Sequence, residues 1–186
     1  MSITGSDFLS LIRANPANAA LLERLPALEL GQCYLTAGCL FQTVWNHRSN
    51  KAPDADILDY DIFYFDTDVS WGAEDTVIRR VDFCTRDLGV KVEVRNQARV
   101  HLWYEERFGH KRAPLQSSRD GVRGFLVECT CVGVNVQSGE LYAPFGLDEL
   151  WNGILRPNPV HPEPELFRAK AESCRLRWPW LRVAGQ

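Results

Sequence analysis

The residues best suited to do chemistry are two aspartates, Asp59 and Asp61, one residue apart within the apolar run from Leu58 to Phe65. A run this rich in aromatic and branched side chains favours a β-strand. Side chains on a strand alternate between its two faces, so both carboxylates are expected on one face, roughly 7 Å apart along the backbone. Two like charges on a half-buried face repel each other and lose hydration. A divalent cation with oxygen ligands would relieve both costs.

A third acid, Glu93, lies on the next predicted strand, Val90 to Arg95, where valines alternate with charged residues. The segment between the strands, Trp71 to Leu88, has helical spacing and ends before a glycine stop signal. Its predicted buried stripe consists of Val77, Val81, Cys84 and Leu88. A strand–helix–strand order readily makes two strands neighbours in one sheet. We therefore expect Asp59, Asp61 and Glu93 to project from adjacent strands to one face of a mixed sheet.

A simpler interpretation of the same residues needs no metal. Arg95 shares a predicted face with Glu93, so it could pair with Asp59 or Asp61 in a structural network of charges. The two interpretations differ in what neutralises the carboxylates, which is a bound metal ion in the first and the guanidinium of Arg95 in the second.

The remaining elements follow from periodicity and from turn residues. The N-terminal segment, residues 1–29, reads as two short helices split near Asn15, which could cap the second one ahead of Pro16. Residues 100–108 fit a strand and a helix equally well. The other expected elements are helices over 30–45, 117–125, 148–155 and in the tail from 163 to 183, and strands over 129–136 and 141–143.

Composition narrows the function classes. The net charge is −3, which disfavours a general nucleic-acid coat, although residues 107–112 form a short basic cluster that is either a solvated loop or a local patch. The opening residues lack the pattern of a secretory signal and no apolar run is long enough to span a membrane, so we expect a cytoplasmic protein with reduced thiols. Cys129 and Cys131 do not have zinc-ligand spacing and read as small core residues on a strand.

The three carboxylates in this order resemble the polymerase-beta-type nucleotidyltransferase superfamily. More closely, the chain resembles a bacterial family of uncharacterised nucleotidyltransferase-like proteins. The matching stretches are Phe41–Asn46, Asp59–Asp66, Val92–Tyr104 and Tyr142–Leu147. The resemblance implies an α/β (α+β) fold, with a mixed sheet flanked by helices and preceded by N-terminal helices. It divides the chain into the N-terminal helical segment 1–29, a nucleotidyltransferase-like domain over 30–160 and a C-terminal helical tail, 161–186, packed on that domain.

The resemblance also implies a site. Asp59, Asp61 and Glu93 would be catalytic and would hold Mg²⁺ or Mn²⁺. A glycine-containing segment around Gly38 would contact nucleotide phosphates, although this chain has Cys39 where the superfamily usually has glycine or serine. The other implied nucleotide-binding residues are Gln42, Thr43, Asn46 and Arg95.

The implied function is metal-dependent transfer of a nucleoside monophosphate from an NTP to an acceptor hydroxyl. Because the chain is slightly acidic, a small-molecule or protein acceptor is favoured over bulk nucleic acid. Candidate residues of the acceptor pocket are Asn96, Gln97, His101 and Trp103. The alternatives are a catalytically inactive nucleotide-binding regulatory protein, which Cys39 favours, and an interaction protein that merely retains the carboxylates.

Overall fold

The fold is built on a mixed five-stranded sheet. The computed structural model describes residues 3–185. The strand order is β3-β2-β1-β4-β5, in which β2 and β3 are parallel and the other neighbours are antiparallel. The strands are β1 (Tyr34–Thr36), β2 (Tyr60–Tyr64), β3 (Val92–Asn96), β4 (Gly133–Asn135) and β5 (Leu141–Tyr142). The predicted mixed sheet with flanking helices is therefore confirmed.

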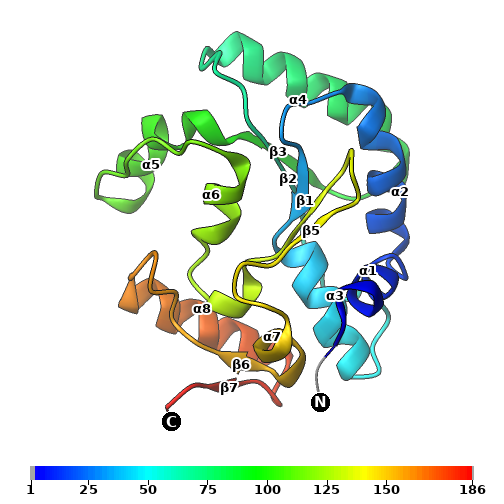
Figure 1. Cartoon of the computed structure of the whole chain (residues 1–186), viewed down its shortest axis with the longest axis vertical. Coiled ribbons are helices and arrows are strands. Elements are labelled where there is room, and N and C mark those ends of the chain that lie inside the picture. Colours follow the sequence, from blue (N-terminus) through cyan, green and yellow to red (C-terminus); the bar gives the residue numbers. More distant parts are fainter. Residues whose placement is uncertain (1–2, 186) are drawn as a thin grey trace.

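Helices cover both faces of the sheet, with α2 and α6 on opposite sides (Figure 1). None of the helices within residues 3–185 is both long and apolar enough to cross a membrane. A second, two-stranded parallel sheet joins β6 (Ile154–Leu155) to β7 (Arg182–Val183). The α-helices are α1 (Gly5–Ile12), α2 (Pro16–Arg24), α3 (Gly38–Arg48), α4 (Trp71–Thr85), α5 (Val100–Phe108), α6 (Ser118–Arg123), α7 (Asp148–Asn152) and α8 (Pro164–Arg177).

The N-terminal helices divide where the sequence predicts. Asn15 caps α2 through its side-chain oxygen, which accepts from the Ala17 amide at 3.0 Å, and Pro16 is the first helical residue. The side-chain nitrogen of Asn15 donates to the Tyr60 hydroxyl and to Thr43 Oγ1, each at 3.2 Å. A single buried cap thus ties the start of α2 to β2 and α3.

The expected helix over 30–45 is wrong in its first half. Residues 34–36 form β1, the central strand of the sheet, and α3 begins only at Gly38. All three residues of β1 are buried, and strands pair with β1 along both of its edges. A three-residue strand buried on both faces shows no alternation, so its sequence does not distinguish it from a helix. Ala37, with φ of 62°, turns the chain sharply between the two elements.

Two further elements differ from expectation. The predicted strand over 129–136 is limited to β4, and Cys129 lies in a 3₁₀ turn, Glu128–Thr130. The predicted helix over 148–155 ends at Asn152, because Gly153 adopts φ of 68° and the chain continues as β6. The ambiguous stretch 100–108 is the helix α5.

Helix α4 packs largely as predicted. Val77 and Val81 are buried, but Cys84 is only partly buried and Thr85 takes the inward position on the last turn. The reason is the contact with α2, where Arg24 donates to the Cys84 carbonyl at 2.9 Å and pairs with Asp87. That contact places Cys84 at the margin between α2 and α4, so the stripe expected from spacing alone shifts by one residue.

The buried acid Glu74 anchors the end of β3, and its loss should be felt in stability. Its Oε1 accepts from the backbone N–H of Asn96 at 2.9 Å, and its Oε2 lies 2.7 Å from Arg99 Nε. Glu74→Gln removes the charge that both partners face, so we expect the free energy of unfolding to fall by about 2 kcal/mol, as for other hydrogen bonds to charged groups. Urea denaturation measures this change. The exposed variant Glu106→Gln is the control, and equal losses in both variants would contradict the anchoring role.

Candidate active site

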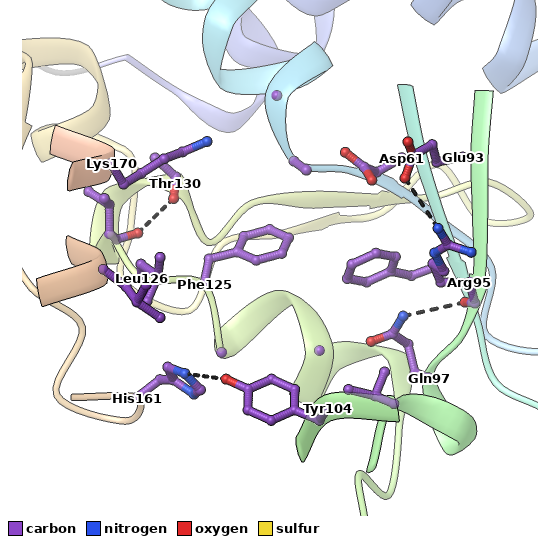
Figure 2. A pocket seen from close by; sticks show the side chains of 18 of the residues that line it. Asp61, Glu93, Arg95, Gln97, Tyr104, Phe125, Leu126, Thr130, His161 and Lys170 are labelled. Atoms are coloured by element: carbon purple, nitrogen blue, oxygen red, sulfur yellow. Dashed lines mark hydrogen bonds and ion pairs between the residues drawn. The ribbon is translucent and has the colours of Figure 1, made fainter. Parts of the chain in front are cut away.

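One cavity of about 450 Å³ collects the predicted acidic residues. Its walls come from the start of α3, from β2 and β3, and from α5, α6 and α8 (Figure 2). Asp59, Asp61 and Glu93 all line it. This volume is in the usual range for small-ligand pockets.

The register of the sheet explains why the carboxylates meet. Asp61 on β2 pairs directly with Glu93 on β3 in the parallel ladder. Neighbours in register share one face of the sheet, so both side chains project into the cavity. Asp59 stands just before β2 and two residues from Asp61, which returns its side chain to the same face. The structure therefore brings together all three acids that the sequence singled out.

Electrostatics distinguish Asp61 from Glu93. Burial, and then the neighbouring charges of Asp59 and Glu93, raise the pKa of Asp61 to about 7, while Lys170 and Arg95 oppose the rise. The pKa of Glu93 is lowered, chiefly by a hydrogen bond from Lys91 and also by the charge of Arg95. Arg95 Nη2 lies 3.5 Å from Glu93 Oε2. The metal-free interpretation predicted that Arg95 pairs with Asp59 or Asp61. In the structure, the ion pair of Arg95 is with Glu93 instead.

The donors at this face fit a hard cation. Asp59 and Asp61 offer carboxylate oxygens only, the ligands that Mg²⁺ and Mn²⁺ take, and a cation there would oppose the burial and the like charges that raise the pKa of Asp61. Across residues 3–185, no group of three acidic, histidine or cysteine side chains is arranged so that it could hold a metal ion by itself. Oxygens of a bound phosphate and of water would therefore have to complete the coordination, as is usual for Mg²⁺.

The start of α3 opens onto the cavity. Ala37 and Gly38 line it, and a Cβ on Gly38 would lie only 2.6 Å from Gln42 Nε2. The first turn of a helix leaves backbone amides unpaired and carries a partial positive charge, both of which suit an anion. Cys39 is fully buried, and its thiol donates to the Thr36 carbonyl at 3.1 Å. Cys39, the residue that departs from the superfamily pattern, therefore faces the core and does not line the cavity.

The predicted nucleotide-binding residues divide into two groups. Gly38, Gln42 and Arg95 line the cavity. Thr43 and Asn46 do not, because both are buried in hydrogen bonds of the fold.

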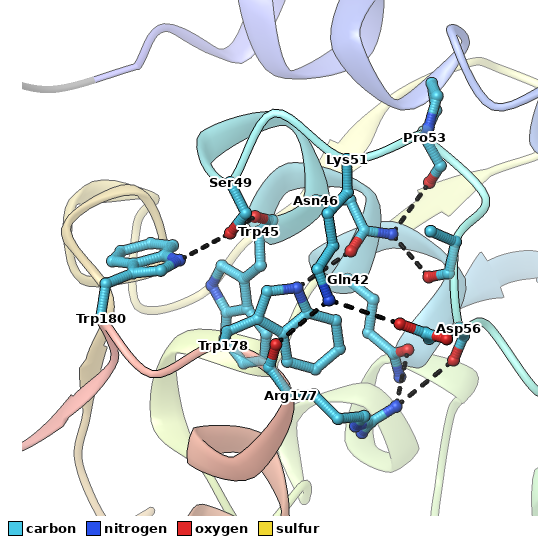
Figure 3. A network of polar contacts seen from close by, with 11 residues as sticks. Gln42, Trp45, Asn46, Ser49, Lys51, Pro53, Asp56, Arg177, Trp178 and Trp180 are labelled. Carbon is cyan, nitrogen blue, oxygen red and sulfur yellow. Dashed lines mark hydrogen bonds and ion pairs between the residues drawn. The ribbon is translucent and has the colours of Figure 1, made fainter.

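Those buried hydrogen bonds lie within α3 and between α3 and its neighbours. Thr43 donates to the Cys39 carbonyl at 2.7 Å, and Asn46 donates to the Ala55 carbonyl at 2.7 Å and accepts from Trp178 Nε1 at 2.9 Å (Figure 3). A nucleotide contact from either residue stays a prediction, and these bonds do not favour it.

Of the proposed acceptor-pocket residues, Gln97 and Trp103 line the cavity, whereas Asn96 and His101 do not. Asn96 is buried, and its side-chain nitrogen donates to the Asp66 carbonyl at 2.9 Å. Sequence reasoning missed further lining residues, among them Phe63, Tyr104, Arg112, Phe125, His161 and Lys170. Of those named, only Arg112 had a signal, as part of the basic cluster 107–112.

Asp61 should make the metal-free protein lose stability as pH rises. Its folded pKa of about 7 exceeds the ordinary value of 3.8, so between about pH 4 and pH 7 the native state holds a proton that the unfolded chain has released. The free energy of unfolding contributed by this group therefore falls across that window. Asp61→Asn removes the effect, and we expect the variant to be more stable than the wild type at pH 8, by at most about 4 kcal/mol, and equal to it near pH 4.

Urea midpoints at pH 4, 6 and 8 measure this difference. Asp82→Asn, which removes one exposed charge from α4, is the control and should follow the wild type. An Asp61→Asn variant that is less stable than the wild type at pH 8 would mean that the carboxylate is a structural partner.

Comparisons with known proteins agree with this architecture. The model of a family described as "Nucleotidyltransferase" matches residues 23–183. A solved structure entitled "The NMR structure of the protein reveals a CCA-adding enzyme head domain" matches with a TM-score of 0.75 at 25% sequence identity, covering 98% of this chain and 97% of that one. A search of curated proteins finds no match.

Proposed function

The chain belongs to the nucleotidyltransferase family, and from this membership we propose that it transfers a nucleoside monophosphate from an NTP to an acceptor hydroxyl. The acceptor oxygen forms a bond to the α-phosphorus, the bond from that phosphorus to the β-phosphate oxygen breaks, and pyrophosphate leaves. The hydroxyl proton is released. The observation that carries the proposal is the convergence of Asp59, Asp61 and Glu93 on one cavity beside the start of α3.

Asp59, Asp61 and Glu93 are the residues that would hold Mg²⁺ or Mn²⁺. When bound, the cation supplies positive charge against the phosphate oxygens and lowers the cost of the crowded carboxylates. Glu93 is better suited to hold charge than to take up a proton, because Lys91 and Arg95 keep its pKa below the ordinary value and a useful base needs a pKa near the working pH.

The chain's own cations would orient the triphosphate. Arg95 and Lys170 both act on the charge of Asp61, and Arg107 acts on Glu93. Lys170 points from α8 into the cavity on the side that faces Asp61 (Figure 2). Three cations from three different elements around a carboxylate face give a phosphate chain contacts on several sides, in addition to the amides at the start of α3.

Thermal denaturation with a panel of the four NTPs, with and without Mg²⁺ or Mn²⁺, tests nucleotide binding. A ligand that binds only the native state raises its stability by about 2.7 kcal/mol at a hundredfold excess over Kd. We expect at least one NTP to raise the melting temperature, and to do so more strongly with the cation. If none of the four NTPs changed the melting temperature, with or without the cation, the proposal that the protein uses an NTP would be contradicted.

The alternative, a catalytically inactive nucleotide-binding regulatory protein, rested on Cys39. That side chain does not line the cavity, so it gives the alternative no support. Turnover separates the two accounts, as the Discussion describes.

A further inference from the structure

The cavity has a second end, remote from the carboxylates. Tyr104 of α5, Leu126 and His161 lie there, on the far side of the cavity from Asp61 and Glu93 (Figure 2). Arg112 belongs to the same end, because its guanidinium lies 5.1 Å from the centre of the Tyr104 ring. We refer to Tyr104, Arg112, Leu126 and His161 as the far end.

Arg112 is built into this wall. Its Nη2 atom lies 2.2 Å from the position that a Cβ on residue 124 would take, so the guanidinium packs directly against Gly124 and would have to shift if a side chain stood there. The side chain is half-buried, and among residues 3–185 no carboxylate lies within ion-pair distance of it. Glu163, an acid of this region, lies 2.7 Å from His110 Nε2 and outside ion-pair distance of Arg112, although its charge acts on Tyr104 and His161 as that of Arg112 does. A half-buried guanidinium with no acidic partner calls for an anion from outside the chain.

The other polar groups of the far end carry no compensating charge. Tyr104 Oη and His161 Nε2 lie 2.9 Å apart. Burial raises the pKa of Tyr104, which keeps its hydroxyl protonated, and burial together with Arg112 lowers the pKa of His161, which keeps its ring neutral at pH 7. Arg112 is therefore the positive charge of the far end, opposed by the nearby negative charge of Glu163, and the Tyr104–His161 pair offers neutral hydrogen bonds beside the guanidinium.

The cations of the cavity divide between its two ends. Arg95, Arg107 and Lys170 act on the carboxylates Asp61 and Glu93. Arg112 instead acts on Tyr104 and His161. A triphosphate drawn to the carboxylate end would be served by the first three cations, and Arg112 would remain for a second molecule.

We propose that the far end binds the acceptor, and that the acceptor is a small molecule with an anionic group, a carboxylate or a phosphate monoester, held by Arg112. The proposal rests on the nucleotidyltransferase function and adds the substrate class. Two apolar side chains, Leu126 at the far end and Phe125 of the cavity wall, would contact the acceptor's body, and its hydroxyl would point toward the carboxylate end. A nucleobase is the less suitable occupant, because it is neutral and leaves the guanidinium without a counter-charge.

Ligand-observed NMR with matched small probes tests the site without requiring turnover. The probes are 3-hydroxybenzoate, its neutral amide 3-hydroxybenzamide, and phenyl phosphate, and the two anions distinguish carboxylate from phosphate recognition. We expect at least one anion to bind the wild type ~10-fold or more tightly than the amide. Arg112→Gln should weaken that anion by roughly 10- to 100-fold, the range for a charge-assisted hydrogen bond, and leave the amide unchanged.

Lys111→Gln is the matched control, because it removes the same charge from the neighbouring exposed residue, which does not line the cavity. It should change anion affinity by less than about twofold, as expected of an exposed charge. Equal losses in the two variants, or equal binding of acid and amide to the wild type, would overturn the proposal.

The nucleotide arm separates this proposal from the one it rests on. Arg112→Gln should keep the wild-type shift in melting temperature with NTP and Mg²⁺. If the variant loses that shift while anion binding is unchanged, the far end belongs to the nucleotide and the acceptor assignment fails. If the wild type binds the anions through Arg112 but responds to no nucleotide, the transferase proposal fails and the anion site stands.

Discussion

Asp61→Asn is expected to lower the rate of nucleotidyl transfer by at least about 10³-fold while the protein stays folded. Burial and the charges of Asp59 and Glu93 raise the pKa of Asp61 to about 7, so its ionised form is costly and a cation bound there would relieve that cost. Asparagine keeps the shape of the side chain but removes the charge that a cation requires. The variant should also lose the Mg²⁺-dependent part of the shift in melting temperature that NTP causes. Single-turnover rates and thermal denaturation measure the two effects.

Asp82→Asn, on the exposed side of α4, is the control for this variant. It removes one negative charge at a distance from the cavity and should retain the wild-type rate. If Asp61→Asn retained transfer within about tenfold of the wild type, a difference of only ~1.4 kcal/mol, Asp61 could not be the principal holder of the metal.

Glu93→Gln is expected to lower the rate by roughly 10²-fold and to change nucleotide affinity only a few-fold. Glu93 stands in register with Asp61, yet Lys91 and Arg95 already offset its charge. Its carboxylate therefore contributes little to the binding of the nucleotide in the ground state. It contributes more to the transition state, in which charge develops on the phosphate oxygens. Separate measurements of kcat and of nucleotide binding distinguish these contributions.

Lys91→Gln is the matched control, because it breaks the same ion pair from the other side and keeps the carboxylate. We expect it to retain most of the activity. Loss of activity as large as that in Glu93→Gln would mean that the ion pair, and not the carboxylate, is what the reaction requires.

The carboxylate face was predictable because its information is local. Alternation along β2 places Asp59 and Asp61 on one face, and the strand–helix–strand order places β3 beside β2. The central strand β1 was not predictable, because its three residues are buried on both sides and show no period. Its neighbours come from residues 60–64 and 133–135, which are distant in the sequence.

The far end shows the same limit. Tyr104, Arg112 and His161 come from three separate segments, and each of them alone reads as a core or surface residue. Lys170 lies on a helix that also carries the exposed charges of Glu165, Arg168, Glu172 and Arg175, so nothing in its spacing separates it from these solvated neighbours. Lys170 lines the cavity because α8 packs beside it, and this packing is not visible in the sequence. The Thr43 hydroxyl and the Asn46 side-chain amide illustrate the converse, because both were predicted to contact the nucleotide and instead make hydrogen bonds in the core.

The most direct test of the central claim follows the transferred group itself. The wild-type protein is incubated with an NTP labelled at the α-phosphate, Mg²⁺ and a panel of small hydroxy acids and phosphate monoesters, and the products are separated. We predict that the label joins an acceptor and that one pyrophosphate is released for each label transferred, with neither product formed by Asp61→Asn. Tight, metal-dependent binding of the nucleotide with no pyrophosphate released across the whole panel would contradict the enzymatic account and identify a nucleotide-binding regulatory protein instead.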